Sequence, residues 1–108
     1  MDAIKSKAKE IEKDVVRWYR DLHRIPELHD QLPMTTAYVR SVLEELGIPY
    51  NVYSNSGIRA VIECCEGDKA IAFRADMDAL PVTEETGLPF ESEHKGCMHA
   101  CGHDAHTA

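Results

Sequence analysis

Hydrophobic residues recur at steps of three and four over residues 2–24, a spacing that predicts an amphipathic helix. Its apolar stripe consists of Ile4, Ala8, Ile11, Val15, Trp18 and Leu22. Pro26 disfavours helical geometry at the residue before it, so this helix should end close to that point. A second helix is predicted over residues 34–46, with Gly47 as a left-handed cap and Pro49 just beyond it. Its buried side is expected to contain Tyr38, Val39, Val42, Leu43 and Leu46.

The hydrophobic period then changes to two, which is typical of β-strands. Residues 50–54 predict a short strand, residues 55–57 a turn, and residues 58–65 a second strand. The run AIAF, residues 70–73, is apolar throughout, as expected for a strand that is buried on both faces. Two helices followed by a β-hairpin and a buried strand predict the opening of an α/β domain.

Two carboxylates follow the predicted buried strand. Asp76 and Asp78 lie two positions apart, and in open α/β sheets ligands gather outside the carboxyl ends of the strands. One of the two side chains could therefore touch a ligand or a metal while the other anchors the loop. The alternative is that either aspartate only caps a turn before Pro81.

The residues between this pair and the end of the chain are rich in polar and turn-forming types. Residues 81–96 are therefore predicted to form a surface loop, with His94 exposed to solvent. Cys64 and Cys65, at the end of the second predicted strand, are interpreted as ordinary strand residues.

The closing segment CMHACGHDAHTA, residues 97–108, combines two cysteines with three histidines. Thiolate and imidazole are the ligands that zinc and similar metals prefer. The sequence places Cys97, His99, Cys101 and His103 at every second position, and His106 follows. Four ligands from one extended stretch could hardly surround one ion, because structural zinc sites draw ligand pairs from distant segments. The pattern favours two ligands here and the others elsewhere.

Neighbouring residues could support such a site. Gly102 would allow an unusual backbone dihedral or a close approach to a metal. Asp104 is interpreted either as a helix N-cap or as a carboxylate that orients a ligating histidine. Cys97 is expected to be only a small side chain near the site, and His99 and His106 could either support ligands or serve packing.

Charge and composition narrow the class of protein. The chain has 12 basic and 19 acidic residues and a formal net charge of −7, which argues against a nucleic acid or an anionic membrane as partner. No apolar run is long enough to predict a transmembrane helix or a secretory segment. The four cysteines lie in two tight groups without a signal peptide, which favours reduced thiols and a cytoplasmic location.

Four stretches together resemble the N-terminal part of the dinuclear-metal amidohydrolases and metallopeptidases, the family of hippurate hydrolase, auxin-conjugate (IAA-amino acid) hydrolases and N-acetyldiaminopimelate deacetylase. The stretches are RDLHRIPEL, TAYVRSVLEELGIPY, IAFRADMDALPVTEETGLPFESEHKG and MHACGHDAHTA. The resemblance covers most of the chain from residue 20 onward. It implies the N-terminal part of a zinc-peptidase-like catalytic domain, in which the predicted buried strand leads into the metal-site loop.

The resemblance also implies roles for single residues. Cys101 and His103 match metal-ligand positions of the family's CGHD motif. Asp78 matches the catalytic-site aspartate that orients a metal ligand in related di-zinc peptidases. Those relatives carry histidine where this chain has Asp76, so a metal-binding role cannot be transferred to Asp76. Asp76, Asp104 and His106 are therefore regarded as possible residues that support the metal ligands.

In this family two divalent ions (zinc, manganese, cobalt or nickel) activate a water molecule, and a glutamate acts as base in hydrolysing the amide bond of N-acyl amino acids. That glutamate, the other ligands and a dimerisation domain follow the CGHD motif. Residues 1–108 are therefore expected to be a truncated N-terminal portion of the catalytic domain, inactive alone, whose full-length form acts on a small molecule and could form a homo-oligomer. The alternative is a small, self-contained cytosolic module that binds a metal through its cysteines and histidines.

Overall fold

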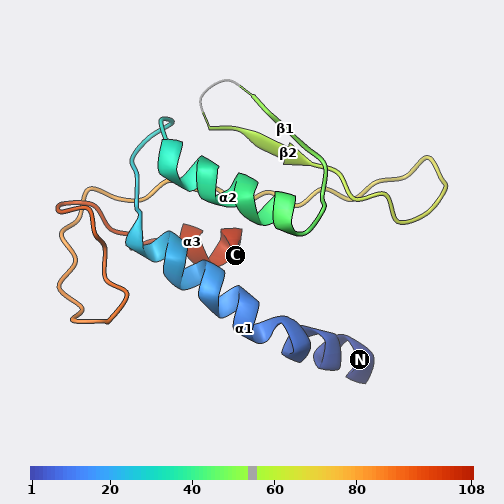
Figure 1. Cartoon of the computed structure of the whole chain (residues 1–108), viewed down its shortest axis with the longest axis horizontal. Helices are drawn as coiled ribbons and strands as arrows, with labels where there is room; N and C mark the ends of the chain where they lie inside the picture. Colours follow the sequence, from blue (N-terminus) through green and yellow to red (C-terminus); the bar gives the residue numbers. More distant parts are fainter. Residues whose placement is uncertain (54–55) are drawn as a thin grey trace.

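The computed structural model describes residues 1–53 and 56–108. Its elements, in chain order, are α1 (Asp2–Arg24), α2 (Pro33–Glu45), β1 (Tyr50–Val52), β2 (Ile58–Ala60) and α3 (His103–Thr107). The two long helices lie near each other, and the short α3 returns from the end of the chain to the carboxyl-terminal half of α1 (Figure 1). Within the described residues, no helix combines the length and the apolar character needed to cross a membrane.

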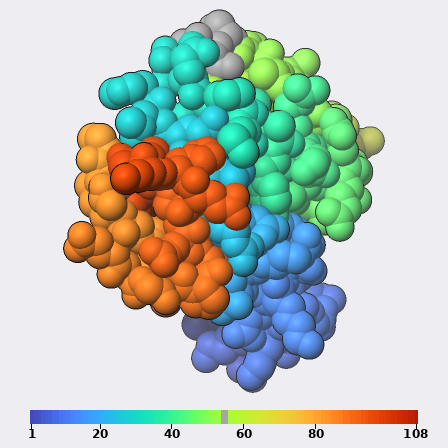
Figure 2. All heavy atoms as spheres, turned by 60° about the vertical axis from the view of Figure 1, so that its left-hand side comes forward, coloured from blue at the N-terminus to red at the C-terminus, as the bar shows by residue number. Residues whose placement is uncertain are grey.

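Helix α1 matches its predicted bounds, but most of its apolar stripe is not buried. Ile4 and Ile11 are 71% and 53% exposed, whereas Leu22 is 2% exposed. The first half of α1 projects from the rest of the molecule (Figures 1 and 2). The periodicity thus identified the helix correctly, while burial is confined to the last turns, where other described segments lie against it.

Helix α2 begins one residue earlier than predicted, at Pro33, because proline is well accommodated in the first helical turn. The Glu27 carboxylate accepts the backbone N–H groups of Met34 at 3.2 Å and Thr35 at 2.6 Å, which satisfies two free donors of that turn. At the other end Gly47 has φ +68°, as the sequence predicted for a left-handed cap.

The predicted buried side of α2 is only partly correct. The fully buried residues of this helix are Thr35 and Thr36 in its first turn. The predicted apolar residues Tyr38 and Val42 are half-buried, and Leu46 is 52% exposed. The helix therefore anchors through its amino-terminal end, close to the segment that leads out of α1.

The predicted hairpin is present, with shorter strands. β1 and β2 pair antiparallel, with Tyr50 opposite Ala60 and Val52 opposite Ile58. The predicted second strand ends early, so Cys64 and Cys65 are exposed and outside any strand, which corrects their interpretation as strand residues. Ser54 in the predicted first strand and Asn55 in the predicted turn lie outside the described residues.

The strand predicted over residues 70–73 is wrong for this structure. Ile71 and Phe73 are 86% and 97% exposed, and no described segment pairs with this run. A strand needs neighbours to satisfy its backbone groups and to cover its faces, and the apolar composition indicates a preference for burial without supplying those neighbours. This run therefore presents uncovered apolar side chains.

The loop predicted over residues 81–96 is irregular, as expected, and it is held at both ends. Leu80 and Met98 exchange backbone hydrogen bonds of 2.9 and 3.0 Å, and the Ala79 N–H donates to the Glu27 carbonyl at 2.7 Å. The loop lies against the last turns of α1 (Figure 2, orange). The buried apolar side chains among the described residues are those of Leu22, Leu32, Ala79 and Cys97.

Candidate metal centre

His103 lies at the start of α3 and is oriented by Asp78. Its Nδ1 atom lies 2.8 Å from the backbone carbonyl oxygen of Asp78 and 3.1 Å from the Oδ1 atom of the same residue. Both partners are acceptors, so Nδ1 carries a proton, and in the neutral ring Nε2 is the nitrogen that keeps its lone pair. A histidine held in this way by a carboxylate is the usual arrangement of a metal-ligating imidazole.

The turn that precedes His103 depends on Gly102. Gly102 is the N-cap of α3 and has φ +95°, a conformation that favours glycine, as the sequence suggested. A Cβ atom there would meet only His106 Nε2 at 4.0 Å, so the requirement is for the dihedral rather than for space. Cys101, immediately before the turn, has an exposed free thiol.

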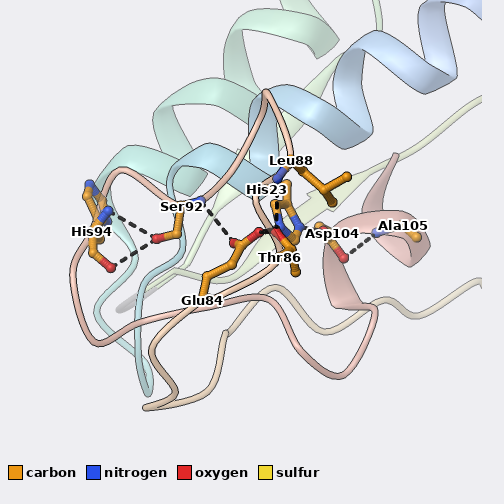
Figure 3. Close-up of polar contacts among 8 residues, drawn as sticks. All are labelled: His23, Glu84, Thr86, Leu88, Ser92, His94, Asp104 and Ala105. Carbon is orange, nitrogen blue, oxygen red and sulfur yellow. Dashed lines mark hydrogen bonds and ion pairs between the residues drawn. The ribbon is translucent and has the colours of Figure 1, made fainter.

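Asp104 is the second residue of α3 and not its N-cap, which is Gly102, so the N-cap interpretation is wrong. Its role in orienting a ligating histidine stays a prediction. Its Oδ2 atom accepts a hydrogen bond from Nδ1 of His23 at 2.7 Å. The other ring nitrogen of His23, Nε2, lies 2.9 and 3.1 Å from the two carboxylate oxygens of Glu84 (Figure 3). We call His23, Glu84 and Asp104 the buried triad, because their side chains are 4%, 3% and 2% exposed.

The buried triad is charged. Each nitrogen of His23 faces a carboxylate, so both carry protons. Burial disfavours the charged ring, but the hydrogen bonds that the ring donates to Asp104 and Glu84 outweigh this effect and raise the pKa of His23 above its ordinary value. Burial also opposes the charge on Glu84, yet hydrogen bonds from Thr86, Ser92 and His23 lower the pKa of that carboxyl group.

His23 and Glu84 were not identified as site residues from the sequence. The only available signal was the position of His23 beside Leu22, at the buried end of the helical stripe and inside the stretch RDLHRIPEL. Glu84 lies in the predicted polar loop, where a glutamate is an ordinary surface residue. The two residues are 61 positions apart, so no local pattern could pair them.

His99 is the second buried histidine of the region, at 5% exposure. Neither of its ring nitrogens has a hydrogen-bond partner among the residues that the structure describes. Burial lowers the pKa of His99, so its ring is neutral, and its centroid lies 6.5 Å from that of His23. His106 is exposed, with its ring centroid 6.2 Å from that of His103.

The free energy of unfolding of the metal-free chain is expected to peak near pH 6.5, the ordinary pKa of imidazole. The raised pKa of His23 gives a stabilisation that is complete below pH 6.5 and is lost as the pH rises through its folded value. The lowered pKa of His99 decreases the free energy of unfolding below pH 6.5, because there the unfolded chain binds a proton at His99 that the folded chain does not. Below pH 4.5 the lowered pKa of Glu84 decreases the free energy of unfolding further.

Urea unfolding with EDTA from about pH 4 to 8, below the range in which thiols and phenols titrate, measures this profile. A free energy of unfolding that rose steadily across that range would contradict the charged state assigned to His23.

Asp76 and Cys97, which were also considered from the sequence, make simpler contacts. The Asp76 carboxylate pairs with Arg74 at 2.7 Å near the surface, and its backbone carbonyl accepts the Thr107 hydroxyl at 3.2 Å. The buried Cys97 thiol donates to the Pro26 carbonyl at 3.3 Å, and burial raises its pKa, so it is a neutral packing residue as expected.

His94, expected to be exposed, is half-buried. Its Nδ1 atom donates to the Pro26 carbonyl at 2.7 Å, so it ties the predicted surface loop to the segment after α1. The composition of the loop is polar, but this one side chain satisfies a backbone carbonyl that the fold brings close to it.

The donor set fits a divalent metal of zinc type, although it is incomplete. Cys101 can supply a thiolate and His103 an imidazole Nε2, with Asp78 fixing the ring. Across the described part of the chain, no three or more Cys, His, Asp and Glu side chains are grouped so that they could hold an ion. That this segment supplies two ligands and other segments supply the rest stays a prediction.

Comparison with known proteins shows which proteins this chain is similar to. Residues 72–108 match the model of the peptidase family M20/M25/M40. The chain is 48% identical over 99 residues to the N-acetyl-L-cysteine deacetylase of Bacillus subtilis, covering 91% of this chain and 24% of that enzyme. It is 44% identical over 98 residues to the N-acetyldiaminopimelate deacetylase of Halalkalibacterium halodurans, covering 89% of this chain and 26% of that enzyme.

A solved structure gives the same result. The YXEP protein of Bacillus subtilis, described as a dinuclear metal binding peptidase from the M20 family, superposes with a TM-score of 0.85 at 44% identity. The match covers 92% of this chain and 28% of that one. The resemblance to the dinuclear-metal amidohydrolases and the α/β fold class are therefore confirmed. The chain spans about a quarter of the length of the curated relatives it matches.

Proposed function

We propose that this chain, a match to peptidase family M20/M25/M40, contributes two metal ligands to an amidohydrolase that acts on N-acyl amino acids. The observation that supports this most directly is the contact between Asp78 and His103, which holds Nδ1 of the ring and leaves Nε2 free for an ion. Cys101, two residues earlier, offers a second donor of the kind that zinc prefers.

Each residue has a separate part in the proposed site. Cys101 and His103 Nε2 would hold a divalent ion, and Asp78 keeps the imidazole in the tautomer that can bind it. The bound ions supply Lewis acidity and an activated water molecule. Two ions per site is the number we infer, in keeping with the dinuclear description of the YXEP protein.

The substrate class is inferred from the relatives. Two of them are named as deacetylases of N-acetylated amino acids, so we propose that the acyl group removed is acetyl or of similar size. A thiol that serves as a metal ligand must stay reduced, which fits the cytoplasmic location expected from the sequence. The absence of a nucleic-acid partner and the formation of a homo-oligomer stay predictions.

We further propose that residues 1–108 form the N-terminal portion of a catalytic domain and do not hydrolyse amides alone. The described residues hold no group of three or more possible metal ligands, and Ile71 and Phe73 present uncovered apolar surface. Both features fit a site and a sheet completed by further residues. The alternative, a self-contained metal module, would need a grouped set of ligands within the described residues, and none is present there.

Cobalt titration of the reduced chain tests the proposal. Cobalt bound to a thiolate gives a near-ultraviolet charge-transfer band, which should appear with the wild-type chain and with the matched control Cys64→Ser, and should vanish with Cys101→Ser. The His103→Gln variant should bind cobalt roughly tenfold more weakly or worse. The chain alone should not release acetate from N-acetyl-L-cysteine.

Two results would contradict the proposal. A charge-transfer band that survives in Cys101→Ser would place the ligand elsewhere. Tight one-to-one binding that orders the chain cooperatively would instead support the self-contained module.

A further inference from the structure

Helix α3, which carries His103, cannot maintain its own orientation. It has five residues and no side-chain cap, and a helix of that length is not stable alone. The direction of the His103 ring must therefore come from contacts between α3 and distant segments. Three such contacts are present: Asp78 to His103, Asp76 to Thr107, and His23 to Asp104.

Among these contacts, the one between His23 and Asp104 is the most deeply buried and joins oppositely charged groups. Its two atoms lie 2.7 Å apart, and the side chains are 4% and 2% exposed. By contrast, Thr107 donates its hydroxyl at 3.2 Å to a backbone carbonyl in a half-buried setting. A buried charged hydrogen bond restrains geometry more strongly than a neutral one that is partly accessible to water.

Glu84 keeps the ring of His23 from turning away from Asp104. It accepts from Nε2 of His23 and is itself held by the Ser92 N–H at 2.9 Å and by the Thr86 hydroxyl (Figure 3). With both ring nitrogens engaged, the imidazole has one orientation that satisfies all its partners. The ring therefore connects the last turn of α1 rigidly to the second residue of α3.

We propose that His23 is a positioning residue for the metal ligand His103. By fixing Asp104, it holds the turn at Gly102 so that His103 keeps Nδ1 on Asp78 and points Nε2 toward a divalent cation. The claim that His103 binds a metal rests on the proposed function. The claim that His23 positions His103 is independent of it, because the contacts are complete without a metal.

Two substitutions of His23 separate positioning from general stabilisation. The amide of asparagine lies near the position of Nδ1, so His23→Asn keeps a donor for Asp104. The amide of glutamine lies near the position of Nε2, so His23→Gln keeps a donor for Glu84 only. Both variants lose one buried hydrogen bond and the positive charge, and their overall destabilisation should be similar.

The measurement is the tautomer of His103 in the metal-free chain, read from ring ¹⁵N shifts near pH 7, where an ordinary imidazole is mostly neutral while the raised pKa of His23 still favours its charged form. A His103→Gln spectrum identifies the signals. Wild type and His23→Asn are expected to show the Nδ1–H form. His23→Gln is expected to show mixed tautomers and about tenfold weaker cobalt binding.

An unchanged Nδ1–H form in His23→Gln, or an equal change in both variants, would overturn the positioning role. If His23→Gln does not fold, Asp104→Asn preserves the shape with a weaker acceptor and must shift the tautomer in the same direction, or the proposal fails. Failure of the wild-type chain to bind cobalt would refute the proposed function instead, because the tautomer comparison needs no metal.

Discussion

Replacing His23 with leucine is expected to lower the free energy of unfolding by about 3–5 kcal/mol, the usual loss when one partner of a buried ion pair is removed. The substitution leaves Glu84 and Asp104, 3% and 2% exposed, without their shared positive charge. Domains have about 5–15 kcal/mol in total, so the change would remove a large share of that stability. Urea unfolding near pH 6.5 measures it.

A matched control is the exposed His29, which has φ +64° in the loop before α2. Asparagine tolerates that backbone conformation, so His29→Asn should change the free energy of unfolding by no more than about 0.5 kcal/mol. Adding Glu84→Gln and Asp104→Asn to His23→Leu should restore part of the loss, since it removes the uncompensated charges. A loss below about 1 kcal/mol in the single variant would contradict the buried ion pairs assigned to the triad.

The local parts of the fold could be predicted because their causes are local. The period of three and four identified α1, and Gly47 was correctly predicted to end α2 through its own dihedral preference, whereas α2 begins one residue before its predicted start, at Pro33. The spacing of Cys101, Gly102 and His103 predicts a metal-binding turn from one short segment, and this stays a prediction.

Burial could not be predicted in the same way, because it depends on what lies opposite. Ile4 and Phe73 have the composition of core residues, yet no described segment covers them. The buried triad shows the converse case: His23 and Asp104 are 81 residues apart, and neither lies in a pattern that indicates its partner. A charged side chain can be buried only when the fold brings an oppositely charged group next to it. The hydrophobic periodicity of the sequence therefore does not predict which charged residues are buried.

Replacing Asp78 with alanine is expected to weaken cobalt binding by about tenfold, at the low end of the 10–100-fold effect typical of residues that orient metal ligands. The carboxylate contact at 3.1 Å is lost, but the backbone carbonyl of the same residue still accepts the proton on His103 Nδ1 at 2.8 Å. The ring therefore keeps its preferred tautomer, while its orientation loosens and the basicity of Nε2 falls. Competition with a chromophoric chelator gives the affinity.

Asp76 supplies the matched control, two positions away and of the same residue type. Among the described residues its carboxylate pairs with Arg74, whose side chain is 84% exposed, and such a surface pair contributes little. Asp76→Ala should therefore leave cobalt affinity within about twofold of wild type, as expected for the loss of an exposed ion pair. Equal losses in the two variants would mean that nearby negative charge, rather than orientation of His103, determines metal affinity. Losses confined to Asp78→Ala would identify its carboxylate as the group that prepares the ligand.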